Sequence, residues 1–128
     1  MSVQEKIARL SAFIRQNPAL ANIPFMTVAG RPVSPAEALA MLQSGQNIHE
    51  VVMGLSRLGI DPDWELVEEF YKRLAAARPD VKIYGLGLPP MSPAEALQHI
   101  RARDEIGRQL LETYSRMLAY MRERMGGL

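Results

Sequence analysis

The 128-residue chain contains no cysteine and only two histidines. The absence of thiols excludes disulfides, thiolate zinc sites and cysteine nucleophiles. Acid-base and nucleophilic catalysis need a nucleophile, a base and an orienting group close together, and the serines mostly stand where helices are expected to begin. We therefore predict a protein that is not an enzyme and that holds no metal or cofactor.

Long apolar runs and a strong charge of one sign are also missing. No stretch approaches the roughly 18 apolar residues of a membrane span, and the N-terminus lacks the apolar core of a signal peptide. The formal net charge is +1, whereas general binding to nucleic acid needs many uncompensated cations. We expect a soluble, cytoplasmic protein with no membrane partner.

The residues that are present predict a mainly α fold. With 48% apolar residues, the chain is expected to form a single domain, 1–128, with its own core. Helical periodicity and capping signals place an N-terminal helix and a middle helical portion in residues 1–90. Short β-like segments at 25–28 and 81–84 allow a minimal two-stranded element at most.

One long C-terminal helix is predicted over residues 93–125. Ser92, Pro93 and Glu95 form a helix start with a capping box, and Gly126 follows the end. A helix of 33 residues would span about 50 Å, whereas a globule of this chain length is about 36 Å across. We expect it to project, to kink near Gly107, or to pack against another subunit.

Apolar side chains cover half of this helix, more than a two-stranded coiled-coil seam requires. We predict a coiled-coil-like interface in a non-catalytic helical assembly or adaptor subunit, with a second copy or another protein as partner. Its residues are Ile106, Leu110, Tyr114, Met117, Leu118, Met121 and Met125. On the other half, four i,i+4 ion pairs are expected: Arg101 with Glu105, Asp104 with Arg108, Arg108 with Glu112, and Glu112 with Arg116.

Near the start of the long helix, Glu95, His99 and Arg103 follow each other at i, i+4 and i+8. A buried or interfacial line of acid, imidazole and guanidinium can bind a small anion or a carboxylate. We favour the alternative that these first turns remain solvated and bind nothing, because a lone histidine seldom marks a site.

A nucleic-acid-associated function is a further alternative. Residues 35–58 predict two short helices joined by a glycine-containing turn, as in a helix-turn-helix. The residues offered for binding are Arg57, Arg101, Arg103, Arg122 and Arg124. The second helix of the pair carries one outward cation, Arg57, which disfavours DNA reading.

The hexapeptide SPAEAL occurs at both 34–39 and 92–97. Two independent helix starts explain it, because the sequence is close to an ideal N-terminal cap. A duplicated strand-turn-helix unit is the alternative, and it would allow residues 25–28 to pair with residues 81–84.

Overall fold

The computed structural model describes residues 2–60, 63–84, 87 and 89–126. Within them it confirms a mainly helical fold with a long C-terminal helix and one antiparallel hairpin. The elements are α1 (Val3–Gln16), a 3₁₀ turn η1 (Pro18–Leu20), β1 (Met26–Val28), β2 (Arg31–Val33), α2 (Pro35–Ser44), α3 (Ile48–Ser56), α4 (Trp64–Ala77), α5 (Pro93–Ala102) and α6 (Glu105–Arg124).

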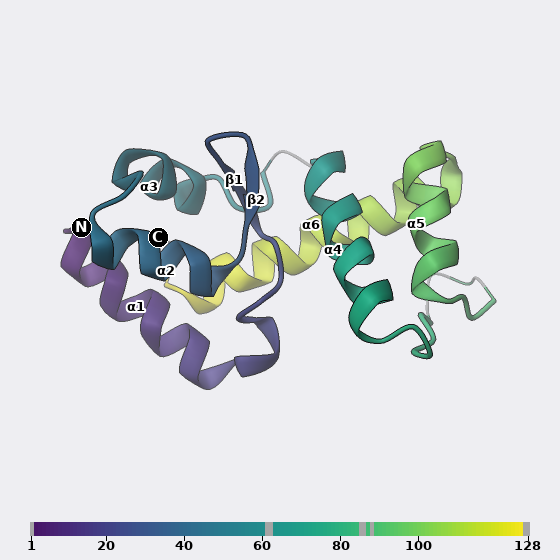
Figure 1. The fold of residues 1–128 in the computed structure, drawn as a ribbon, viewed down its shortest axis with the longest axis horizontal. Coiled ribbons are helices and arrows are strands. Elements are labelled where there is room, and N and C mark those ends of the chain that lie inside the picture. The colour runs from purple at the N-terminus through teal and green to yellow at the C-terminus, as the bar shows by residue number, and fades with distance from the viewer. Residues whose placement is uncertain (1, 61–62, 85–86, 88, 127–128) are drawn as a thin grey trace.

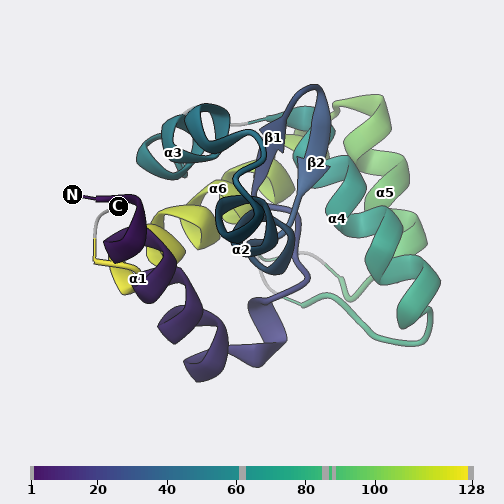
Figure 2. The same cartoon turned by 60° about the vertical axis from the view of Figure 1, so that its left-hand side comes forward.

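Helix α6 runs along the length of the molecule (Figure 1). The helices α1, α2 and α3 gather with the hairpin at one end, and α4 and α5 lie at the other. The two termini come together at the first end (Figure 2). There the Arg9 guanidinium donates a hydrogen bond to the carbonyl of Gly126 at 2.9 Å. One core cluster extends over all these helices, from Leu10 and Phe13 to Met121.

The hairpin forms where the short apolar segment was expected. Met26 pairs with Val33 and Val28 with Arg31, and the turn residues Ala29 and Gly30 both have positive φ. A two-residue turn of this kind matches the right-handed twist of the strands.

The repeated hexapeptide has the same local structure twice. Ser34 and Ser92 each cap a helix whose third residue, Glu37 or Glu95, completes a capping box. Each serine also follows the second partner of an antiparallel pair, which is β2 before α2 and the Ile83–Met91 bridge before α5. Pairing of 25–28 with 81–84 is therefore wrong, because each segment finds its partner nearby in the sequence.

The C-terminal helix starts later than predicted. Residues 93–125 form two helices, α5 and α6, which Arg103 separates by adopting a left-handed conformation with φ 51°. Asp104 then caps α6, since its Oδ1 accepts a hydrogen bond from the Gly107 amide at 2.8 Å. The break therefore precedes Gly107, which lies in the first turn of α6. The remaining helix of 20 residues is about 30 Å long and fits along the globule.

Candidate functional site

The apolar side of α6 is covered by this chain's own helices. Five of the seven predicted interface residues are at most 4% exposed: Leu110, Tyr114, Leu118, Met121 and Met125. The other two, Ile106 and Met117, are partly buried against the same core. This face therefore needs no partner to leave water, and an interface formed by these seven residues stays a prediction.

The outward side of α6 carries one i,i+4 row of exposed residues, which starts at Arg108 and continues through four others: Glu112, Arg116, Tyr120 and Arg124. An Arg116 Nη2 atom lies 3.6 Å from Glu112 Oε1. The Arg124 guanidinium lies over the Tyr120 ring at 5.2 Å, and its Nε donates to the Tyr120 hydroxyl at 2.7 Å. Tyr120 remains 46% exposed. We call these four residues the α6 ridge.

The other predicted ion pairs of this helix are not formed. Arg101 lies on α5 and donates to Glu68 of α4 at 2.8 Å, instead of meeting Glu105. Asp104 contacts His99 instead of Arg108. The first change follows from the break at Arg103, because i,i+4 neighbours meet only within a continuous helix. The second follows from the cap of α6, where the Asp104 carboxylate already binds His99 and the Gly107 amide. Of the four predicted pairs, only Glu112 with Arg116 is present in the described residues.

The predicted anion site does not assemble as a line of three side chains. Glu95 is engaged in the cap of α5, where its Oε1 accepts from the Ser92 hydroxyl at 3.1 Å. His99 Nδ1 lies 2.6 Å from Asp104 Oδ2 at the corner between α5 and α6. Arg103, beyond the helix end, lies over the Trp64 ring at 5.2 Å. Each group therefore stabilises local structure, and anion binding by the three stays a prediction.

The arginines proposed for nucleic acid are spread over the molecule. Arg101 and Arg103 contact α4, through Glu68 and Trp64, and Arg124 contacts Tyr120. Arg57 follows α3 and lines a pocket, and Arg122 is half-buried on α6. The pair α2 and α3 exists, with a turn at residues 45–47. Exposed α3 positions include Glu50 and Met53, so the helix pair offers little positive charge to a polyanion such as nucleic acid.

A pocket of about 280 Å³ opens beside β1, between the end of α3 and the start of α4. Its floor includes the buried side chains of Phe25 and Leu66. Asp63 and Arg57 supply one acid and one base. Asp63 caps α4 through Oδ1, and its Oδ2 accepts from the Thr27 hydroxyl at 3.5 Å. The pocket was not anticipated from the sequence.

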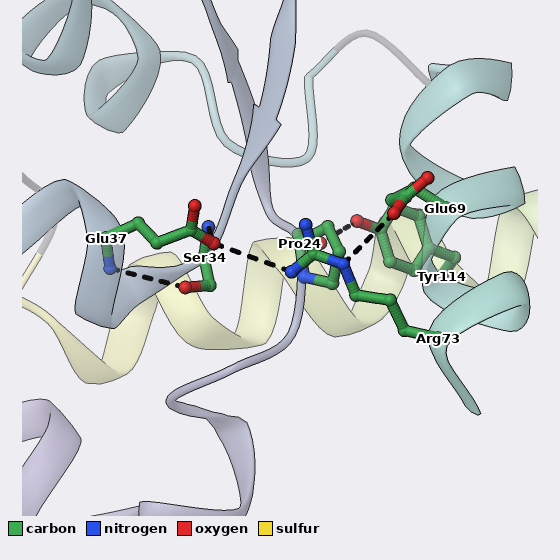
Figure 3. A network of polar contacts seen from close by, with 6 residues as sticks. All are labelled: Pro24, Ser34, Glu37, Glu69, Arg73 and Tyr114. Carbon is green, nitrogen blue, oxygen red and sulfur yellow. Dashed lines mark hydrogen bonds and ion pairs between the residues drawn. The ribbon is translucent and has the colours of Figure 1, made fainter. Parts of the chain in front are cut away.

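Two sets of polar contacts lie in the middle of the molecule, one between α4 and α2 and one between α6 and the segment before the hairpin (Figure 3). Arg73 of α4 donates through Nε to Glu69 at 3.1 Å and through Nη1 to Glu37 of α2 at 3.5 Å. The Tyr114 hydroxyl of α6 donates to the carbonyl of Pro24, just before the hairpin. These bonds fix the α4 and α6 helices against the hairpin side of the fold.

The two buried phenols are unsuited to acid-base work. Burial raises the pKa of Tyr71 to about 12. Burial, followed by the nearby charge of Asp63, also raises the pKa of Tyr114 well above its usual range. Neither hydroxyl exchanges a proton easily near neutral pH.

No His, Asp or Glu side chains of the described residues cluster in threes as a metal site would require. Among the same residues, no helix combines the length and apolar character needed to cross a membrane. Comparison with known proteins gives no matching family model, no matching curated protein and no matching solved structure.

Proposed function

We propose that this protein is a non-catalytic assembly subunit that binds a second copy of itself through the α6 ridge. The observation that carries the proposal is Tyr120, a large aromatic side chain that is 46% exposed between two arginines of the α6 ridge. Tyrosine and arginine are the residues that most often dominate the binding energy of protein interfaces.

The charges of the ridge support a second copy as the partner. The ridge contains one acid, two bases and one aromatic ring. Guanidinium groups bind carboxylates and stack on aromatic faces. A second ridge therefore offers the arginines a further carboxylate and a further aromatic ring, in addition to those that they contact within their own chain.

The expected association is weak. The ridge extends over 12 residue steps, or about 18 Å of helix, and a contact of this length buries less than the roughly 1,200 Å² of a standard interface. Tyr120 supplies the apolar centre, and the ion pairs around it are exposed to solvent and screened by salt. Dimers should form at high protein concentration and dissociate more readily as salt is added.

Two tyrosine variants test the proposal. Tyr120→Arg places a third guanidinium between Arg116 and Arg124 at the centre of the contact and should leave the protein monomeric. Tyr84→Arg makes the same change at a tyrosine outside α6, which is 72% exposed, and should leave association unchanged. The readout is the solution mass by light scattering over a series of concentrations at low salt. Equal solution masses for both variants and the wild type would exclude the α6 ridge as the surface of self-association.

A further inference from the structure

We infer that the two copies pair antiparallel about a two-fold axis between the Arg116 and Tyr120 positions of the ridge, so that Glu112 of each copy faces Arg124 of the other and Arg116 faces Tyr120. This inference rests on the proposed self-association and adds its register and symmetry. It follows from the order of side chains along the ridge and from the contacts that each already makes.

The geometry of the ridge permits this pairing. Residues at i,i+4 form rows inclined to the helix axis, and two helices pack when such rows interdigitate, with axes crossing near −50°. All four ridge residues are exposed, and Arg116 and Glu112 are each 69% exposed at their side chains. No side chain of the ridge has to leave the core for a second helix to approach.

The order of charges selects the antiparallel direction. In a parallel pair in register, Arg116 would face Arg116 and Arg124 would face Arg124, which places like charges together. In an antiparallel pair, Glu112 meets Arg124 at both ends of the ridge. At its centre the Arg116 guanidinium of each copy meets the Tyr120 ring of the other. Like-charge contacts suppress a wrong arrangement, whereas complementary ones fix the register.

One other antiparallel register also matches charges. Sliding one helix by eight residues would pair Asp104 with Arg124, Arg108 with Tyr120, and Glu112 with Arg116. In the monomer, however, the Asp104 carboxylate already binds His99 at 2.6 Å and caps the Gly107 amide at 2.8 Å. Glu112 has one long contact of 3.6 Å with Arg116. Its carboxylate therefore has more capacity to accept a second arginine.

Charge reversal tests the register. Glu112→Arg and Arg124→Glu should each weaken dimerisation at least about fivefold, because each change removes two symmetric ion pairs and creates like-charge contacts. The combined variant, Glu112→Arg with Arg124→Glu, should restore the dimer to within about threefold of wild type. The two residues are too far apart on one helix to compensate each other within a single chain, so restoration requires two copies.

Arg108→Glu is the matched control, since it reverses an exposed charge on the same helix outside the inferred contact. Its dissociation constant should equal that of wild type, with folding of every variant checked by circular dichroism. A wild-type dimer that the double reversal fails to restore, or that Arg108→Glu disrupts, would overturn this register and leave the proposed self-association standing. A wild type that stays monomeric would overturn both.

Discussion

The α-carbon of Gly107 in α6 lies directly against the carbonyl oxygen of His99 in α5. A β-carbon at residue 107 would overlap that carbonyl group. The amide of Gly107 meanwhile binds Asp104, whose carboxylate also contacts His99. The corner between the two helices is therefore built around a glycine whose missing side chain permits the contact.

Gly107→Ala should destabilise the protein by at least about 1 kcal/mol, because the added methyl group meets backbone that cannot move aside. Helix propensity alone predicts the opposite, a gain of about 1 kcal/mol. Gly54→Ala is the control: it also lies inside a helix, but its nearest neighbour is the flexible side chain of Met26, so its effect should be smaller. Urea unfolding followed by Trp64 fluorescence measures both. A stabilised Gly107→Ala would contradict the close contact.

Gly59→Ala should also be costly, and a second glycine separates the two causes. Gly59 and Gly30 both have positive φ, which an alanine adopts at a cost of about 1 kcal/mol. A β-carbon on Gly59 would also lie 2.7 Å from the Ala119 amide nitrogen, whereas one on Gly30 meets nothing within 4 Å. Gly59→Ala should therefore lower the free energy of unfolding more than Gly30→Ala does. Equal losses of unfolding free energy for the two variants, measured by thermal unfolding, would show that Gly59 is not packed closely against α6.

Asp104 should make stability depend on acid pH. Its pKa is lowered by the hydrogen bond with His99 and then by the Gly107 amide. Because the folded chain holds this proton less tightly than the unfolded chain, the stabilisation is complete above the unfolded pKa of about 3.9. It is lost as the pH falls through the lower, folded value.

Asp104→Asn should therefore lose less stability than wild type between about pH 5 and pH 2. Urea unfolding at a series of pH values gives the comparison. Asp80→Asn, an exposed change between α4 and α5, should behave as wild type. An unaltered acid dependence in Asp104→Asn would mean that the carboxylate is not held by the corner.

Removing the Tyr114 hydroxyl should cost about 1–2 kcal/mol, since it leaves the Pro24 carbonyl without its partner. Tyr71→Phe is the matched control. The Tyr71 hydroxyl makes no hydrogen bond within the described residues, and its ring contacts Phe70 edge to face at 4.9 Å. Denaturant unfolding of both phenylalanine variants should give a clear loss for Tyr114→Phe and a small change for Tyr71→Phe. The reverse order would show that the bond to Pro24 contributes nothing.

Local signals in the sequence identified the helix starts after Ser34 and Ser92 correctly. Serine, proline and glutamate act within one turn, so the capping boxes at Ser34 and Ser92 could be read without knowing the fold. Asp104 is also a favoured N-cap residue, and its carboxylate marks the true start of α6. The sequence instead suggests a break near Gly107, because glycine disfavours a helix. The break lies at Arg103, which takes the left-handed conformation although it has a side chain.

Contacts between distant elements could not be predicted in the same way. Arg101 with Glu68, Arg73 with Glu37, and the pocket at Asp63 depend on how α4 packs against its neighbours. Periodicity showed that one side of α6 is apolar, but an apolar stripe has the same pattern whether its own chain or a partner covers it. In the structure, Leu110 and Met121 are buried within one chain, and the opposite side of the helix is the one that remains exposed.

The solution mass of the wild-type protein at increasing concentration and low salt tests the central claim most directly. One chain has a mass of 14.3 kDa. Self-association through the α6 ridge predicts a weight-average mass that rises toward twice this value and falls back when salt is added. A mass that remains at 14.3 kDa up to the highest attainable concentration at low salt would contradict it.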